Sequence, residues 1–200
     1  MKKTILLSSL FLMAPNLASA EVDYFNSISL GIQAGQNKGL EEYLGSKYDK
    51  KGEQDLFGGY AKLSTAFNSH LFFEAEFTGM STGKTQYRDH YAGLGIKGAA
   101  NGILPFVSFG VNRIDVERGN NKFNEYSPSS HMGVKFAPVS FLTLTPSYRY
   151  SLVDSDSMSK FSVMGDINFT EHFTIELGAS YKIYRNSEQW SGVSGLKFHF

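Results

Sequence analysis

The sequence contains no cysteine, and this absence removes disulfide frameworks, thiolate metal sites and thiol catalysis together. It also lacks an excess of either charge, because 19 Lys and Arg residues stand against 19 Asp and Glu residues in a chain of 200. A nucleic-acid-binding protein would show a basic excess, so the charge balance gives that class no support. Intrinsic disorder is excluded as well, since disordered chains are poor in aromatic residues and 14% of this chain is aromatic.

Glycine and aromatic residues are abundant, whereas proline is scarce: the chain has 20 Gly, 17 Phe and 11 Tyr but only 5 Pro. Its mean hydropathy is nevertheless slightly negative, as in a soluble protein. After the first twenty residues there is no run of about 18 apolar residues, so we expect no transmembrane helix there. No Gly/Ser-rich linker or low-complexity tract divides the chain, which favours a single domain.

The first twenty residues have the pattern of a secretory signal peptide. Lys2 and Lys3 form a basic start, residues 5–13 are mostly apolar, and Ala18-Ser19-Ala20 provides a small-residue cleavage site. A membrane anchor is the alternative, but the apolar stretch is too short to span a bilayer. We therefore expect residues 1–20 to be cleaved after Ala20 and residues 21–200 to be exported. Without Lys2 and Lys3, 17 basic residues face 19 acidic ones, a net charge of −2.

Beyond residue 21, apolar side chains recur at every second position, which predicts β-strands rather than helices. In residues 71–77, for example, Leu71, Phe73 and Phe77 alternate with Glu74 and Glu76. Ten such runs are present, at residues 28–34, 57–67, 71–77, 92–96, 105–111, 132–136, 142–152, 161–169, 173–183 and 196–200.

The connections between these runs alternate in length. Four are short (68–69, 99–102, 138–140, 170–171) and five are longer and polar (37–55, 81–86, 117–126, 154–159, 185–189). A meander with tight turns at one end and longer loops at the other is typical of an outer-membrane barrel. We therefore predict an all-β fold, an antiparallel up-and-down transmembrane β-barrel of ten strands. Eight is the fallback, because single-chain bacterial barrels have even strand numbers.

Charged residues within the strands all fall on the face opposite the large apolar side chains. We predict that they form a charge network in the barrel lumen, made of Lys62, Glu74, Glu76, Lys97, Lys135, Arg149, Asp166, Glu176, Lys182 and Lys197. A soluble β-sandwich shows the same alternation with the apolar face in a dry core, whereas a membrane barrel turns that face to lipid. Alternation alone cannot separate these two folds. The export signal, the loop asymmetry and the end of the chain favour the barrel.

Aromatic residues gather at the strand ends and predict two girdles at the membrane–water interfaces. The girdle residues are Phe67, Phe77, Tyr87, Tyr150, Phe169, Phe173, Tyr181 and Trp190. Two features fit less well. Pro146 lies mid-strand and cannot donate a ladder hydrogen bond, so we expect a bulge or distortion there. Arg88, Arg113 and Asp115 lie on the predicted lipid face, but near the loop ends, where a charge costs little.

The chain ends in Gly195-Leu196-Lys197-Phe198-His199-Phe200. This ending resembles the C-terminal signal of the outer-membrane barrel-assembly machinery, with Gly195, Phe198 and Phe200 at the expected positions and Val193 where a polar residue is common. With the signal peptide, the mature chain resembles the small Gram-negative outer-membrane barrels: the OmpA-type transmembrane domain, the OmpX/Ail group and the opacity proteins. The resemblance implies an outer-membrane location, with the assembly machinery, outer-membrane lipid and lipopolysaccharide as partners.

The predicted lumen network contains six basic and four acidic residues. Such charges must pair or remain hydrated, because an isolated buried ion is costly. One interpretation is a network that plugs and stiffens the barrel, and the other is a small polar pore. Barrels of about eight strands are filled by side chains and those of 16 or more are open, so ten strands favour the plug. A small-solute channel remains the alternative.

Few residues suggest catalysis, metal binding or a cofactor. Among 5 histidines, only His131, next to Ser129 and Ser130, is placed where a serine hydrolase could use it. It lacks the His-x-Ser motif of the outer-membrane lipid A deacylases. Asp154 and Asp156 are a weak calcium candidate, for which a solvated loop is the simpler explanation. We predict no catalytic residue, no metal site and no cofactor, and keep a lipid A-modifying enzyme as the least favoured alternative.

Segment 37–55 is the longest and most charged connection, and it carries Tyr43 and Tyr48 among charges of both signs. Exposed tyrosines on a loop of a rigid scaffold suit contact with an extracellular protein or glycan, although a loop that shields the barrel is an equal alternative. We predict a monomeric, non-enzymatic barrel with periplasmic termini and a structural or adhesion-type role at the cell surface.

Overall fold

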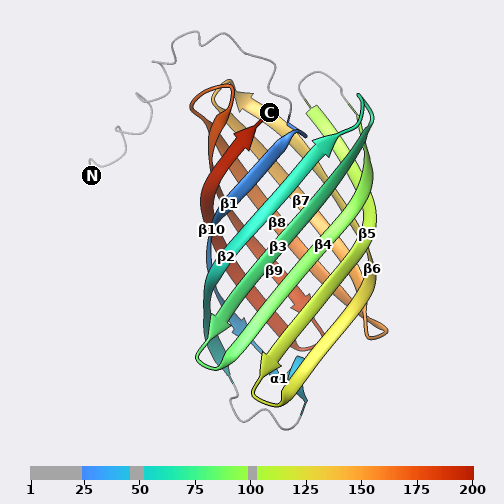
Figure 1. The fold of residues 1–200 in the computed structure, drawn as a ribbon, viewed down its shortest axis with the longest axis vertical. Coiled ribbons are helices and arrows are strands. Elements are labelled where there is room, and N and C mark those ends of the chain that lie inside the picture. The colour runs from blue at the N-terminus through green and yellow to red at the C-terminus, as the bar shows by residue number, and fades with distance from the viewer. Residues whose placement is uncertain (1–23, 46–51, 99–102) are drawn as a thin grey trace, which may run out of the picture.

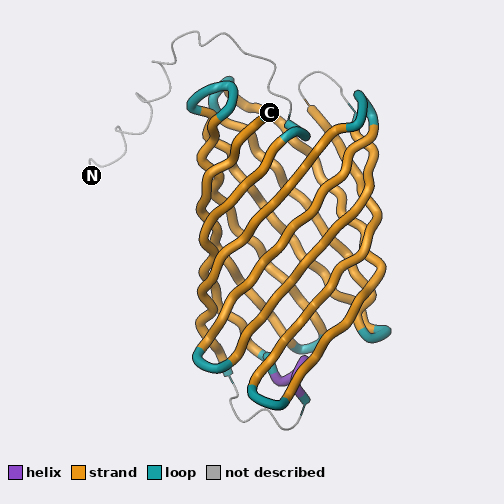
Figure 2. The backbone as a smooth tube through the Cα atoms, in the orientation of Figure 1, coloured by secondary structure: helices purple, strands orange, loops and turns teal. Residues whose placement is uncertain are grey.

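The computed structural model describes residues 24–45, 52–98 and 103–200, which form a β-barrel of ten antiparallel strands. Each strand pairs with its neighbours in sequence, and β1 pairs with β10 to close the barrel (Figures 1 and 2). The strands are β1 (Ser27–Lys38), β2 (Glu53–Ala66), β3 (Leu71–Thr82), β4 (Thr85–Lys97), β5 (Ile103–Arg118), β6 (Asn121–Val139), β7 (Leu142–Val153), β8 (Asp156–Asn168), β9 (Phe173–Tyr184) and β10 (Ser187–His199). The helix α1 (Glu41–Leu44) lies between β1 and β2.

The predicted fold class is confirmed, with ten strands rather than eight. Closure gives every strand two hydrogen-bonded neighbours and leaves no exposed sheet edge. Ser27 at the start of β1 pairs with His199 at the end of β10, so both ends of the barrel chain meet at one rim. The proposed signal peptide lies outside the described residues. Within those residues, no helix is long and apolar enough to cross a membrane.

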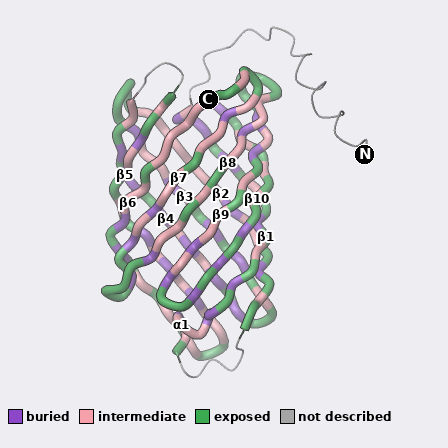
Figure 3. The backbone as a smooth tube through the Cα atoms, turned by 180° about the vertical axis from the view of Figure 1, so that it is seen from behind, coloured by how far each residue is buried: buried purple, intermediate pink, exposed green. Residues whose placement is uncertain are grey.

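The two faces of the sheet differ as the alternation predicts. Outward side chains are large, apolar and exposed, with Phe109 at 68% and Leu196 at 65% exposure. Inward side chains are mostly polar and buried, such as Ser108 and Glu176. Buried and exposed positions therefore alternate along the strands (Figure 3). Apolar surface of this extent is rare on soluble proteins and is what a lipid-facing barrel requires.

The strands are longer than predicted, because four of the five proposed loops are paired strand. The β3–β4, β5–β6, β7–β8 and β9–β10 connections are two-residue turns, at 83–84, 119–120, 154–155 and 185–186. Positive φ angles at Gly83 (54°), Gly119 (57°) and Arg185 (52°) suit such tight hairpins. The loops proposed at 81–86, 117–126, 154–159 and 185–189 are therefore wrong. These segments do not alternate between apolar and polar residues, because both faces of a strand can be polar where it extends beyond the lipid-facing apolar band of the barrel.

The distortion expected at Pro146 is present on one side of its strand. Pro146 pairs in regular register with Val163 of β8. On the other side, the β6–β7 ladder skips the two residues between Gly133 and Phe136, and its register shifts between Phe136 and Val139. Proline has no N–H to donate, so Pro146 cannot form the backbone hydrogen bond to β6 that another residue would form there, and the ladder is interrupted at this point.

Inward glycines allow strands and rings to approach closely. A Cβ atom on Gly110 of β5 would lie 1.9 Å from the carbonyl oxygen of Ala92 on β4. A Cβ atom on Gly195 of β10 would lie 2.4 Å from the hydroxyl of Tyr60, so Gly195 makes room for that ring inside the barrel. The outward Gly79 of β3, in contrast, has open space around an added Cβ atom.

We predict that Gly110→Ala destabilises the barrel by about 1–3 kcal/mol, because the added methyl group overpacks against backbone that is held in the β4–β5 ladder. Gly79→Ala is the matched control and leaves stability unchanged. The measurement is the urea midpoint at which the refolded protein loses its heat-modifiable band on electrophoresis. Equal midpoints for the two variants would contradict this packing.

Candidate functional site

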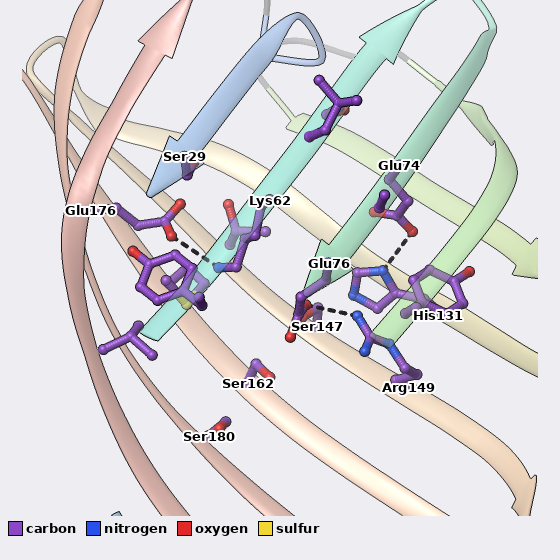
Figure 4. A pocket seen from close by; sticks show the side chains of 18 of the residues that line it. Ser29, Lys62, Glu74, Glu76, His131, Ser147, Arg149, Ser162, Glu176 and Ser180 are labelled. Atoms are coloured by element: carbon purple, nitrogen blue, oxygen red, sulfur yellow. Dashed lines mark hydrogen bonds and ion pairs between the residues drawn. The ribbon is translucent and has the colours of Figure 1, made fainter. Parts of the chain in front are cut away.

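Charged side chains meet across the barrel interior (Figure 4). Lys62 of β2 lies 2.9 Å from Glu176 of β9, and Lys197 of β10 lies 2.8 Å from the other oxygen of the same carboxylate. Lys197 also lies 2.5 Å from Asp166 of β8. The Glu176 side chain is only 2% exposed, so two ammonium groups compensate one fully buried carboxylate.

A second group of charges links β3 and β4 to strands on the far side of the barrel. Glu76 of β3 accepts a hydrogen bond of 2.8 Å from Arg149 of β7 and also pairs with Lys160 of β8. Asp89 of β4 pairs with Lys182 of β9. Because the paired strands are not neighbours in the sheet, these contacts brace the barrel wall from within. An unpaired ion at the same depth would be strongly unfavourable, which gives each brace its strength.

Apolar side chains fill the lumen at the end that carries α1. Leu40 and Tyr43 point into the barrel and are 0% and 5% exposed. Tyr43 stacks on Tyr184, with ring centroids 4.8 Å apart, and meets Phe123 edge-on at 5.5 Å. We call this cluster the loop-side plug; its buried members are Leu40, Tyr43, Leu56, Met80, Tyr87, Ile114, Val116, Val153, Met158 and Tyr184.

The loop-side plug corrects the expectation that Tyr43 is an exposed loop residue. Burial raises the pKa of its hydroxyl well above the ordinary value, so the ring remains uncharged in this apolar setting. The helix is also tied down from outside, because Asn186 donates a hydrogen bond of 3.0 Å to Glu42. The β1–β2 connection is thus folded into the mouth of the barrel, as far as residue 45.

A smaller aromatic cluster closes the opposite end. Phe25, from the segment before β1, is 3% exposed and packs against Phe72 at 4.6 Å and Phe106 at 5.9 Å. The ammonium groups of Lys97 and Lys135 lie 4.7 Å and 4.0 Å from the centre of the Phe25 ring. These cation–π contacts hold the ring in place. We call Phe25, Phe72 and Phe106 the terminus-side plug.

Between the two plugs lies a polar chamber of about 130 Å³. Its wall carries small hydroxyl side chains such as Ser162 and Ser180 (Figure 4) and these members of the charged pairs: Lys62, Glu76, Arg149, Lys160, Glu176 and Lys197. A chamber of this size and polarity has room for a few water molecules, each of which needs polar partners. The interior is therefore polar at its centre and apolar at both mouths.

This arrangement separates the two folds that the sequence left open. A soluble sandwich would bury its apolar face and expose its charges. Here the apolar face is the exterior and the charged face is the interior. The chain has the fold of a small outer-membrane β-barrel.

The barrel brings all ten residues of the predicted lumen network into its interior. Seven of them take part in the ion pairs described above, Glu74 contacts His131, and Lys97 and Lys135 contact the ring of Phe25. Asp89 and Lys160 also belong to the network and are missing from the prediction. Both residues lie at inward positions that follow the alternation of their strands. The predicted strands 92–96 and 161–169 do not include them, because β4 and β8 begin several residues earlier, at Thr85 and Asp156.

The predicted girdle contains one error. Tyr87 is 0% exposed and points inward on β4, where its hydroxyl accepts a hydrogen bond of 2.7 Å from Lys182. The predicted strand begins at residue 92, whereas β4 begins at Thr85, so the alternation that places Tyr87 inward was not recognised. Tyr150 lies outward and half-buried, and Tyr181 stacks on Trp190 with centroids 4.2 Å apart. The remaining girdle residues are 50–63% exposed on the outer surface: Phe67, Phe77, Phe169, Phe173 and Trp190.

His131 has a carboxylate for a partner rather than a serine. Its Nδ1 atom lies 2.8 Å from Glu74, which also accepts a hydrogen bond from Ser108. Ser129 instead lies 2.8 Å from the hydroxyl of Ser151. The Ser–His contact that a serine hydrolase requires is therefore not formed by the neighbouring serine that the sequence suggested.

The carboxylates considered for calcium are bound by a side chain of the barrel itself. Arg185, in the β9–β10 turn, lies 2.9 Å from Asp154 and 2.5 Å from Asp156. Hydrogen bonds to Asp156 and Asp154 raise the pKa of Arg185 further above its ordinary value, so the guanidinium stays charged. Among the described residues, no three His, Asp or Glu side chains gather as metal ligands.

The residues of the proposed assembly signal lie on β10 and just after it. Gly195 faces inward below Tyr60, whereas Phe198 and Phe200 face outward at 38% and 59% exposure. Phe198 packs edge-on against Phe173, with ring centroids 5.3 Å apart. These contacts give Gly195 and Phe198 a structural role, and recognition by the assembly machinery remains a prediction.

No protein-family profile and no curated protein sequence matches the chain. Solved structures do match it. Neisserial surface protein A is 13% identical, with 87% of this chain and 96% of that chain covered and a TM-score of 0.44. Ail of Yersinia pestis is 14% identical over 88% and 97%, with a TM-score of 0.41. The protease OmpT of Escherichia coli is 11% identical over 90% and 98%, with a TM-score of 0.47.

We predict that Glu176→Gln lowers the free energy of unfolding by about 3–5 kcal/mol, because it leaves Lys62 and Lys197 without their shared buried carboxylate. The control is Glu117→Gln, which breaks an exposed pair of 2.9 Å with Lys122 and is expected to cost little, because water screens exposed ion pairs. Urea midpoints of the refolded proteins compare the two changes. A loss for Glu176→Gln no larger than that of the control would rule out the cross-lumen brace.

Proposed function

We propose that the protein is an integral outer-membrane barrel that supports contacts at the cell surface and does not conduct solutes. The observation that carries this proposal is the presence of a cluster of buried apolar side chains in each mouth of the lumen. The apolar exterior supports a place in a bilayer, and barrels of this kind occur in outer membranes. The proposal includes export with cleavage after Ala20, assembly by the barrel-assembly machinery, and termini on the periplasmic side.

The plugs and the braces act together against conduction. Each plug places apolar and aromatic side chains in a mouth of the lumen. An ion that passed them would lose its hydration shell, which is energetically costly. Between them, the cross-lumen pairs fix the charged side chains that would have to move aside. Ten strands lie near the size at which side chains fill a barrel, so this packing suits the diameter. The channel alternative depends on the polar chamber, which would conduct only if both plugs moved.

The loop-side surface supports a role in adhesion. The helix α1 is held from inside by Tyr43 and from outside by the contact between Asn186 and Glu42. The β5–β6 hairpin is the longest, with strands of 16 and 19 residues. A surface that is already rigid loses little conformational entropy when it binds a partner. An extracellular protein or glycan is the class of partner that such a surface suits.

In planar bilayers, we expect the refolded wild-type protein to show no conductance steps. The double variant Tyr43→Ala/Phe25→Ala removes a ring from each plug and is expected to produce small steps of well under a nanosiemens, because water then reaches the chamber from both sides. Phe109→Ala, which removes an outward ring at 68% exposure, is the matched control and stays silent.

Two results of the conductance experiment would count against the closed barrel. Regular steps from the wild-type protein would favour the small-solute channel. Silence of the double variant, in protein that still shows a heat-modifiable band, would mean that the plugs are not what closes the lumen.

The surface role predicts that a non-adherent Gram-negative host gains binding to epithelial cells or to immobilised matrix proteins and glycans when it expresses the protein. The comparison strain carries the vector alone. A second strain expresses Asn186→Ala/Tyr43→Ala, which frees α1, and is expected to bind several-fold less at equal surface abundance. Binding equal to that of the vector strain would leave only the structural role.

A further inference from the structure

Three basic side chains lie next to one another on the inner wall of β7, β8 and β9. In the strand register, Arg149 pairs with Lys160, and Lys160 pairs with Lys182. Like charges directly opposite each other in a sheet repel, so this arrangement is unfavourable unless anions lie beside it. We call Arg149, Lys160 and Lys182 the basic row.

Two carboxylates from the far side of the barrel reach the basic row. Glu76 of β3 pairs with both Arg149 and Lys160, and Asp89 of β4 pairs with Lys182. Three positive charges are thus compensated by two negative ones. The Arg149 side chain is only 4% exposed, yet its Nε atom has no hydrogen-bond partner within the described residues. A buried donor without an acceptor is costly, so the basic row lacks an acceptor.

A row of hydroxyl groups runs alongside the basic row, one inward position nearer the terminus-side plug. Ser147 of β7 pairs with Ser162 of β8, and Ser162 pairs with Ser180 of β9. Side chains paired in this way are about 5 Å apart, so one small anion can reach two of the hydroxyls. Ser162 and Ser180 lie apart from the charged pairs in Figure 4. We call Ser147, Ser162 and Ser180 the serine row.

The polar chamber lies against both rows. Arg149 and Lys160 line it together with all three members of the serine row. Its volume of about 130 Å³ exceeds what a single water molecule needs, and a cavity of about 150 Å³ admits a six-membered ring. Guanidinium, ammonium and hydroxyl donors together suit phosphate and carboxylate oxygens. Glu76 illustrates this chemistry, because its carboxylate lies between Arg149 and Lys160.

The chamber wall as a whole carries more positive than negative charge. Five basic side chains line it against three carboxylates, namely Lys62, Lys135, Arg149, Lys160 and Lys197 against Glu74, Glu76 and Glu176. A fourth carboxylate, that of Asp166, meets Lys197 from outside the chamber. Within the described residues, the partners of the Lys135 ammonium group are neutral: the carbonyl oxygen of Tyr24 and the ring of Phe25. An anion in the chamber would balance this excess.

We propose that the chamber binds a small oxyanion, phosphate or a short carboxylate, between the basic row and the serine row. The anion supplies acceptors to the serine hydroxyls and to the cations that face the chamber. Because apolar clusters occupy both mouths, the anion enters while the barrel folds and is then retained. This route of entry rests on the closed lumen of the proposed function.

The test refolds the protein in detergent with radiolabelled inorganic phosphate or radiolabelled succinate, removes unbound label by gel filtration and counts the label that remains with the barrel. We expect the wild type to retain at least one of the two anions. Ser162→Ala/Ser180→Ala removes two hydroxyl donors without changing a charge, and we expect it to retain at least about tenfold less. Retention of phosphate alone or of succinate alone supports the site and identifies the anion that fits it.

The matched control is Ser129→Ala/Ser151→Ala, which removes two inward hydroxyls that lie 2.8 Å from each other and do not line the chamber. It is expected to retain the anion as the wild type does. Equal retention by the wild type and Ser162→Ala/Ser180→Ala would overturn the proposal. Radiolabelled glycerol offers hydroxyl groups without charge, and its retention at the level of the anions would overturn the assignment to an oxyanion.

Addition of the anion to a barrel that is already folded separates the site from the closed lumen. Uptake as fast as during refolding supports the site and contradicts the plugs. No retention of either anion, in refolded protein that shows a heat-modifiable band, contradicts the anion site alone.

Discussion

A charge inside the barrel must have a partner, and the rest of the structure follows from that constraint. Ten strands enclose an interior that buries charged side chains such as Glu176 and Lys182, and a buried charge without a partner is costly. The carboxylates of Glu76 and Glu176 are therefore shared by cations that arrive from strands on the other side of the lumen. If the two strands of a pair moved apart, both ions would remain buried without a partner, which is strongly unfavourable. Each pair therefore opposes separation of the strands that carry it.

The outer surface of the barrel also separates apolar from polar side chains. Lipid solvates an apolar surface at no cost, so the exterior needs no packing partner and retains large exposed side chains such as Phe109. Polar residues become acceptable only where the strands leave the hydrocarbon, and the stacked Tyr181–Trp190 pair lies toward the loop-side ends of β9 and β10.

Much of this fold could be predicted from period-two alternation, since alternate residues of a strand face opposite sides. Alternation places Lys62 and Glu176 in the lumen, but it does not predict that they pair with each other. Partners across a barrel depend on closure and stagger rather than on spacing in the sequence. In the sequence, the segments around the turns at 154–155 and 185–186 look like longer loops, because strand residues beyond the apolar band do not alternate between apolar and polar. The same effect hid Tyr87, Asp89 and Lys160. Tyr43 looked like an exposed loop residue, since nothing local signals that a four-residue helix folds back into the lumen.

The chain has no cysteine, so single cysteines report directly on whether the chamber is closed. Ser162→Cys and Ser180→Cys place a thiol of similar size on the chamber wall, and Ser155→Cys places one in an exposed turn. The rate of reaction with a charged, membrane-impermeant methanethiosulfonate reagent is the most direct measurement. A closed lumen predicts that the chamber thiols react at least a hundredfold more slowly than the turn thiol in the folded barrel, and equally fast after unfolding. Chamber thiols that react as fast as the turn thiol in the folded barrel would contradict it.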